Sequence, residues 1–128
     1  MHDHDRILRD AYAAFARGDL EGYLAYCTPD ITFTVPGNNK VSGHYTRAEF
    51  GPGMIAKVMQ ATGGTFTEIV LDVFTSARGG VVHAHHAFEA DGEKHEYRTL
   101  HLYEIRDGKL ASFLEVPESF EAFQKAWS

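Results

Sequence analysis

The sequence has a single cysteine, Cys27, and lacks most features that mark a specialised class of protein. One thiol excludes an internal disulfide and any zinc site built from several thiolates. No apolar run approaches the roughly 18 residues that indicate a membrane-spanning helix, and no glycine-rich phosphate loop indicates a nucleotide cofactor. Lys and Arg number 12 against 18 Asp and Glu, a net charge of −6 with His neutral, which excludes a generally basic nucleic-acid binder. We therefore expect no cofactor, no nucleic-acid partner and no membrane association.

The length and composition indicate one globular domain. A chain of 128 residues predicts a single domain over residues 1–128, and 44% hydrophobic with 23% charged residues is typical of a soluble protein. The sequence begins Met-His-Asp-His-Asp, which is polar and acidic and unlike a signal peptide, so we expect a cytoplasmic location. The unusual feature is histidine, because five of the eight His residues lie between positions 83 and 101.

The first half of the sequence reads mainly as helices. Apolar residues recur at helical spacing in its first turns, Asp19 is suited to cap a second short helix, and Thr46 with Glu49 has the spacing of a capping box. Alternating apolar residues between the second and third helices predict one strand. The expected elements are helices over 5–17, 19–27 and 46–62, the last interrupted at Gly51-Pro52-Gly53, and a strand over 31–35.

The second half of the sequence reads as strands. Segments rich in β-branched and aromatic residues are separated by pairs of turn residues, and Asp-Gly between alternating segments is a strong hairpin signal. The expected strands are 66–76, 81–90, 95–106 and 109–116, with turns at Gly79-Gly80, Asp91-Gly92 and Asp107-Gly108 and a final helix that Pro117 opens. Helices followed by an antiparallel meander predict an α+β fold, with helices packed on one face of a curved sheet.

Three segments resemble the nuclear-transport-factor-2-like superfamily, in particular its SnoaL-like polyketide cyclases and ketosteroid isomerases. The segments are Ala16-Arg17-Gly18-Asp19-Leu20-Glu21, Cys27-Thr28-Pro29-Asp30-Ile31-Thr32-Phe33 and Tyr103-Glu104-Ile105-Arg106-Asp107-Gly108-Lys109-Leu110. The resemblance implies a cone-shaped fold, in which N-terminal helices pack on the concave face of a curved antiparallel sheet. It also implies a small-molecule pocket between these layers and a homodimer through the outer sheet face. It does not specify a reaction, because this fold hosts isomerases, cyclases, dehydratases, hydrolases and binding modules.

A two-residue loop at Asp91-Gly92 fixes which side chains of the first hairpin share a face. It pairs Phe88 with His95, His86 with Tyr97 and Val82 with His101. One face then carries Val82, Ala84, His86, Phe88, Tyr97, Thr99, His101 and Tyr103. The other carries His83, His85, Glu89, Arg98, Leu100 and Leu102.

The register of the second hairpin has two alternatives. A glycine-bulge loop at Asp107-Gly108 pairs His101 with Phe113 and Thr99 with Glu115, whereas a plain two-residue loop puts Phe113 and Glu115 on the opposite face. We favour the bulge, since the resemblance implies an acidic residue at the Glu115 position that is directed into the pocket.

His101 and Glu115 are the candidate catalytic residues. The resemblance implies that the His101 position corresponds to the carboxylic acid of the isomerase oxyanion hole, and a His there donates a hydrogen bond to a substrate carbonyl. Glu115 then acts as the base, with a pKa that an apolar pocket raises. The chemistry is proton abstraction next to a carbonyl, or an aldol-type ring closure. The predicted pocket also contains Tyr12, Phe15, Phe33, Val35, Met54, Val58, His86, Phe88, Tyr97, Thr99, Tyr103 and Phe113.

The sequence departs from the isomerases at two positions and leaves other functions open. Val35 stands where the isomerases have the catalytic aspartate, and Ala11 stands where they have the oxyanion-hole tyrosine, although Tyr12 is adjacent. Both departures argue against steroid isomerisation by that mechanism.

One alternative is a binding module for a small apolar ligand, without catalysis. A second is a metal-dependent enzyme, because His83, His85 and Glu89 have the His-x-His-x-x-x-Glu spacing of cupin ligands. Their outer-face position favours polar groups at an interface instead, so we expect no metal. Epoxide hydrolysis pairs two carboxylates with an Arg, and the favoured register separates Arg98 from Glu115.

Overall fold

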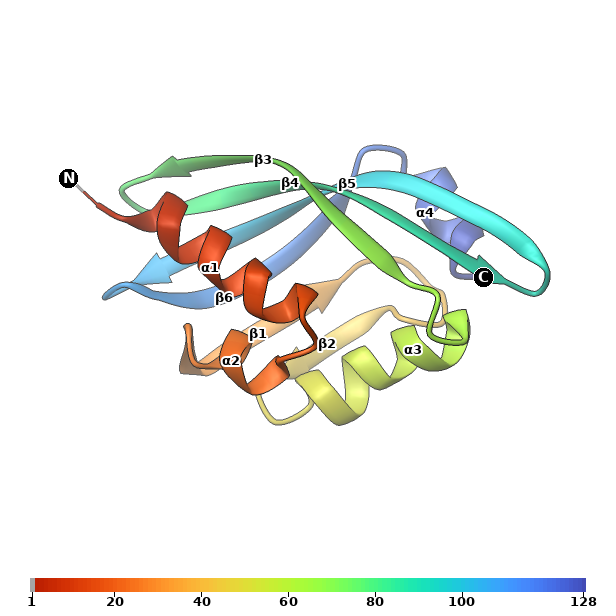
Figure 1. The fold of residues 1–128 in the computed structure, drawn as a ribbon, viewed down its shortest axis with the longest axis horizontal. Helices are drawn as coiled ribbons and strands as arrows, with labels where there is room; N and C mark the ends of the chain where they lie inside the picture. The colour runs from red at the N-terminus through yellow and green to blue at the C-terminus, as the bar shows by residue number, and fades with distance from the viewer. Residues whose placement is uncertain (1) are drawn as a thin grey trace.

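The structure is a computed structural model that describes residues 2–128. These residues form one six-stranded sheet, to which a set of helices is added (Figure 1). In chain order the elements are α1 (His4–Ala16), α2 (Leu20–Leu24), β1 (Cys27–Val35), β2 (Gly43–Thr46), η1 (Phe50–Ile55), α3 (Ala56–Thr62), β3 (Thr67–Ser76), β4 (Gly79–Ala90), β5 (Glu93–Arg106), β6 (Lys109–Pro117) and α4 (Phe120–Ala126).

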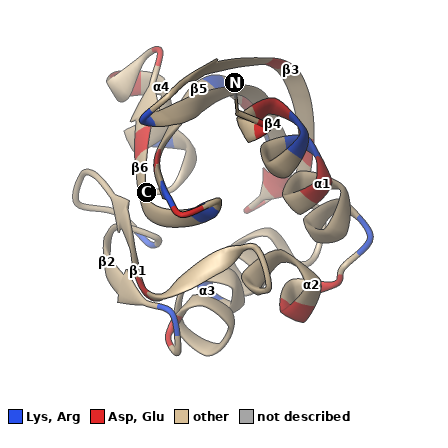
Figure 2. Ribbon diagram, turned by 90° about the vertical axis from the view of Figure 1, so that its left-hand side faces the viewer, with Lys and Arg blue, Asp and Glu red and all other residues tan. Residues whose placement is uncertain are grey.

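The sheet has the strand order β2-β1-β6-β5-β4-β3. Strands β3 to β6 form the antiparallel meander that the sequence predicts. β1 joins it in parallel with β6, and β2, which the sequence analysis did not identify, pairs antiparallel with β1. Viewed from its side, the sheet curls from β3 through β5 and β6 to β1, while α1, α2 and α3 lie along its open side (Figure 2). The fold is therefore the α+β arrangement expected, with helices against the concave face.

The core lies between these layers. Leu8 of α1, Phe33 of β1 and Leu110 of β6 are fully buried there. The close approach of α1 to the sheet explains Gly80, since a Cβ at this position would overlap the Leu8 side chain. No helix within residues 2–128 is both long and apolar enough to cross a membrane.

The β4–β5 hairpin has the predicted register. Ala90 pairs with Glu93, His86 with Tyr97 and Val82 with His101. Asp91 and Gly92 have φ angles of 54° and 78°, the left-handed conformations that a tight two-residue hairpin turn requires.

The β5–β6 hairpin has the predicted faces but different pairs. The loop at Asp107-Gly108 is a plain two-residue turn, because Arg106 pairs with Lys109. The register then shifts at Ala111, a β-bulge inside the strand, so that His101 pairs with Glu115 rather than with Phe113. The bulge that we expected at the turn is therefore three residues further along β6. Because one extra residue reverses the alternation, Glu115 still lies on the same face as His101.

Other boundaries also differ from the sequence analysis. The turn expected at Gly79-Gly80 lies at residues 77–78, and Gly79 begins β4, where a Cβ would overlap the backbone oxygen of Tyr103. The Thr46–Glu49 capping box forms, but it precedes the π-helical turn η1, so no helix starts at Thr46. η1 contains the expected interruption and continues directly into α3. The last helix is capped by Ser119 rather than opened by Pro117, which ends β6.

Candidate functional site

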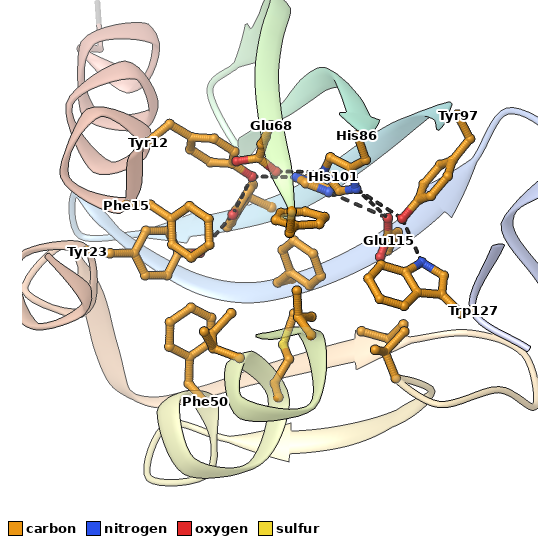
Figure 3. Close-up of a pocket in the computed structure, with 18 residues that line it drawn as sticks. Tyr12, Phe15, Tyr23, Phe50, Glu68, His86, Tyr97, His101, Glu115 and Trp127 are labelled. Atoms are coloured by element: carbon orange, nitrogen blue, oxygen red, sulfur yellow. Dashed lines mark hydrogen bonds and ion pairs between the residues drawn. The ribbon is translucent and has the colours of Figure 1, made fainter. Parts of the chain in front are cut away.

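A cavity of about 70 Å³ lies between the concave face of the sheet and the helices. Its lining divides into two walls (Figure 3). The polar groups come from α1, α2, β3 to β6 and Trp127 after α4, whereas η1, α3 and β1 supply only apolar side chains. The polar lining is Tyr12, Tyr23, Glu68, His86, Tyr97, His101, Tyr103, Glu115 and Trp127, and the apolar lining is Phe15, Val35, Val41, Phe50, Met54, Ile55, Val58, Phe66 and Phe113.

Most residues that the sequence analysis assigned to the pocket line this cavity, and three do not. Phe33, Phe88 and Thr99 are buried but lie outside the lining. The ring of Phe88 packs on Trp127, with 4.3 Å between ring centroids, and the hydroxyl of Thr99 donates to Glu115. These three residues pack behind the side chains that line the cavity.

Glu68 is the main residue that the sequence analysis missed. It pairs with His86 across β3 and β4, and its Oε2 lies 2.7 Å from Nε2 of His86. The His86 side chain is buried, at 6% exposed, and the Glu68 side chain is mostly covered, at 12% exposed. The sequence analysis derived no register for β3 from the turn that it expected at Gly79-Gly80, so it did not assign Glu68 to a face. Tyr23, Phe50 and Trp127 were also missed, since each reads as ordinary core.

A chain of tyrosine hydroxyls ends at His101. Tyr23 lies 2.8 Å from Tyr103, Tyr103 lies 2.7 Å from Tyr12, and Tyr12 lies 2.6 Å from Nδ1 of His101, all between side-chain polar atoms. Tyr12 therefore occupies the place beside the polar wall, while its neighbour Ala11, the position matched to the isomerase tyrosine, is packed in the core. Burial raises the pKa of Tyr12, Tyr23 and Tyr103 well above the usual range, so the three hydroxyls keep their protons.

Counting these protons assigns the tautomer of His101. Among the contacts of residues 2–128, only one order gives every hydroxyl proton an acceptor: Tyr23 donates to Tyr103, Tyr103 to Tyr12, and Tyr12 to Nδ1. Nδ1 is then an acceptor, so the neutral ring carries its proton on Nε2. That nitrogen lies 3.7 Å from Oε2 of Glu115.

Glu115 is an ionised carboxylate in a buried position. Burial raises the pKa of this carboxyl. The interaction with His101, the charge of His86 and the hydrogen bond from Thr99 together outweigh burial and hold the pKa below the usual range. The sequence analysis expected the apolar pocket to raise the pKa of Glu115, and that expectation was wrong. It considered the apolar lining without the imidazoles that face the carboxylate.

His86 lies between two carboxylates. Its Nε2 contacts Glu68, and its Nδ1 lies 3.0 Å from the Tyr97 hydroxyl and 3.9 Å from Oε2 of Glu115. Burial lowers the pKa of His86, but the hydrogen bond with Glu68 and the charges of Glu68 and Glu115 raise it above the usual range. The same pair holds the pKa of Glu68 below its usual range despite burial.

The two histidines of the proposed cupin-like motif contact other carboxylates. His83 contacts Glu118 and His85 lies 3.6 Å from Glu96, both on the outer face of the sheet. Arg98 is also on this face, 3.1 Å from Glu118, and so is far from a role beside Glu115. Within residues 2–128, the one group of three that brings potential metal ligands within 4.8 Å of one another is Glu68, His86 and His101. Glu68 and His86 already satisfy each other by a hydrogen bond.

Comparison with known proteins agrees with this fold. The sequence model of the SnoaL-like domain matches residues 8–113. The chain belongs to this family. An uncharacterised protein of Mycobacterium tuberculosis is 26% identical to this SnoaL-like domain over 121 residues, 91% of this chain and 92% of that protein.

Solved structures share the fold. Bal32a, from a soil-derived mobile gene cassette, superposes with a TM-score of 0.88 at 21% identity, over 98% of this chain and 96% of that chain. A protein of unknown function with a cystatin-like fold from Xanthomonas campestris gives a TM-score of 0.87 at 23% identity over 99% of both chains. TerC, crystallised with polyporic acid, gives 0.82 at 21% identity over 96% of both.

Proposed function

We propose that this SnoaL-like domain catalyses proton transfer on a small carbonyl compound, with Glu115 as the base and His101 as the hydrogen-bond donor. The observation that carries the proposal is the pairing of these two groups on the wall of a largely apolar cavity. Oε2 of Glu115 and Nε2 of His101 are 3.7 Å apart, and both side chains are almost completely buried. A small carbonyl compound presents the two matching groups, an oxygen that accepts and an adjacent C–H that can be removed.

The reaction begins when the substrate carbonyl oxygen accepts a hydrogen bond from Nε2–H of His101. Glu115 then takes the proton from the carbon next to the carbonyl. The C–H bond breaks, an O–H bond forms on the carboxyl group, and the electron pair moves to the carbonyl oxygen as an enolate. A fixed donor aimed at this oxygen stabilises the developing charge, because the donor needs no reorganisation during the reaction. Where a C=C bond is conjugated with the enolate, return of the proton from Glu115 to the far carbon of that bond completes an isomerisation. Attack of the enolate carbon on a second carbonyl group, whose oxygen then takes the proton from Glu115, completes a ring closure.

The lowered pKa of Glu115 leaves the carboxyl ionised at neutral pH, which a group that accepts a proton requires. The opposite wall, with Phe50, Met54 and Val58, favours an apolar body on the substrate. The structural neighbour TerC was crystallised with polyporic acid, which supports a small molecule as the ligand of this fold.

Hydrogen–deuterium exchange tests the proposal without a known substrate. A panel of small cyclic ketones is incubated with the protein in D₂O, and deuterium uptake next to the carbonyl is followed by NMR. We expect Glu115→Gln to abolish exchange while ligand binding persists, and His101→Ala to slow it by about 10²- to 10³-fold, as for removal of an oxyanion donor. Glu104→Gln, an exposed position on β5, is the matched control.

Two results would contradict the proposal. Exchange that both site variants retain would exclude these residues as the catalytic groups. Binding of a ketone to the wild-type protein without any exchange would favour the non-catalytic binding module instead.

We also propose that two copies pair through the outer face of the sheet. Phe74, Val81, Leu102 and Leu114 are neighbours across four strands, and they form an apolar row on this face. Phe74 is 56% exposed and Leu114 is 40% exposed. A contiguous apolar row of this kind is typical of a protein–protein interface. A two-fold axis would cover the row of each copy with that of the other.

A further inference from the structure

The last helix reaches the polar wall through one hydrogen bond. Nε1 of Trp127 donates to the hydroxyl oxygen of Tyr97 at 2.8 Å, and that hydroxyl lies 3.0 Å from Nδ1 of His86. Figure 3 shows Trp127 and Tyr97 together at one end of the row of polar groups. The proposed mechanism uses neither residue.

We propose that Trp127 is a positioning residue, which acts through Tyr97 to favour the form of His86 that has no proton on Nδ1. This inference rests on the proposed function, because Nδ1 of His86 faces the base, Glu115, at 3.9 Å. A proton on Nδ1 would hold Glu115 in an ion pair and make it a weaker base.

The hydrogen bonds around the Tyr97 hydroxyl have fixed directions. An indole nitrogen only donates, so the Tyr97 oxygen must accept from Trp127. Among the contacts of residues 2–128, the Tyr97 hydroxyl has one acceptor for its own proton, which is Nδ1 of His86 at 3.0 Å. Tyr97 is therefore a donor to His86, and Nδ1 is an acceptor.

The groups around His86 compete to favour its charged or its neutral form. The groups that face His86 are Glu68 from β3, Tyr97 and His101 from β5, and Glu115 from β6. Both carboxylates favour the charged ring, which needs an acceptor for a proton on Nδ1. Tyr97 cannot be that acceptor without turning its own buried proton toward the Trp127 N–H. Donation from Trp127 also makes the Tyr97 hydroxyl a stronger donor and a weaker acceptor, since linked hydrogen bonds polarise one another.

This arrangement affects the basicity of Glu115. The two carboxylates favour the charged form of His86 and Trp127 disfavours it, so Trp127 weakens the ion pair between His86 and Glu115. The last helix thus adjusts the basicity of Glu115, although no residue of α4 between Phe120 and Ala126 lines the cavity.

The ring nitrogens of His86 test the inference directly. In ¹⁵N-histidine-labelled wild-type protein above the pKa of His86, we expect NMR to find Nδ1 unprotonated and Nε2 protonated. In Trp127→Phe the Tyr97 hydroxyl is free to rotate, so we expect the pKa of His86 to rise by about half a unit to one unit, the size of one hydrogen bond. Trp127→Phe added to Tyr97→Phe should give no further change, because the effect passes through Tyr97.

Phe123→Leu is the matched control, since this residue of α4 packs edge-on against Tyr97, with 5.5 Å between ring centroids, and makes no hydrogen bond to it. The inference is overturned by a wild-type His86 that carries its neutral proton on Nδ1, by an unchanged pKa in Trp127→Phe, or by an equal rise in Phe123→Leu. The wild-type measurement needs no variant to fold. None of these readings needs turnover, so they stand whether or not the deuterium-exchange experiment succeeds.

Discussion

Replacing Glu68 with Gln should weaken the fold in a pH-dependent way. The carboxylate accepts the Nε2–H of His86 at 2.7 Å, and the two side chains are 12% and 6% exposed, so solvent screens the pair little. The amide oxygen of Gln can still accept this proton, and only the charge is lost. A hydrogen bond to a charged group contributes about 1.5–3 kcal/mol and a neutral one about 0.5–1.5 kcal/mol. We therefore expect Glu68→Gln to lower the free energy of unfolding by about 1–2 kcal/mol where both groups are charged.

The directions of the two pKa shifts define that pH window. The pKa of Glu68 is lowered in the folded state, so its contribution is complete above the unfolded value, about 4.3, and is lost as the pH falls through the folded value. The pKa of His86 is raised, so its contribution is complete below the unfolded value, about 6.5, and is lost as the pH rises through the folded value. The pair therefore stabilises most between about pH 4.3 and 6.5.

Urea unfolding at pH 5.5 and pH 9 measures the effect. We expect the difference between wild type and Glu68→Gln to be largest at the lower pH and to shrink at the higher pH. Glu104→Gln, which removes a charge from an exposed strand position, should show no such change. A loss in Glu68→Gln that is equal at both pH values would refute an ion pair as its cause.

Two further predictions concern the tyrosine chain and the outer face. Tyr103→Phe should destabilise the protein by about 1–3 kcal/mol in urea unfolding, because it leaves the buried Tyr23 hydroxyl without its acceptor. Tyr26→Phe, outside the chain, is the control, and an equal loss there would contradict the reason given. Leu114→Glu should convert a dimer to a monomer in analytical ultracentrifugation, whereas Met59→Glu, an exposed apolar position on α3, should not. A wild-type protein that sediments as a monomer would exclude the proposed pairing.

For the central strands, the sequence predicted the face on which each side chain lies better than the residue with which it pairs. The turn at Asp91-Gly92 has a strong chemical signal, and the register of β4 with β5 followed from it residue by residue. The partner expected for His101 was wrong by two residues, yet Glu115 lay on the predicted face. This is because a side chain's face depends only on whether the shift is odd or even, and a shift of two residues preserves it.

The sequence did not predict the position of Glu68, because that position depends on a turn and on a β-bulge that no residue type indicates. The turn before β4 uses Ala77 and Arg78 rather than the glycine pair that follows. A bulge at Leu71 then shifts the register of β3, so that Val70 pairs with Ala84 and Asp72 with His83. Neither feature has a residue type that predicts it. With unbroken alternation from this turn, Glu68 would lie on the outer face.

Both carboxylates of the site depend on a bulge in the same way. Without the extra residue Ala111, Glu115 would lie opposite Leu100 and point away from the cavity, just as Glu68 would without Leu71. The two histidines are on strands that pair with each other in unbroken register, whereas each flanking strand carries one bulge between its turn and its glutamate. A bulge interrupts the ladder and re-aims the side chains beyond it. Each bulge brings a carboxylate onto the face that carries the two imidazoles. The row of two glutamates and two histidines therefore exists because β3 and β6 each break their alternation once.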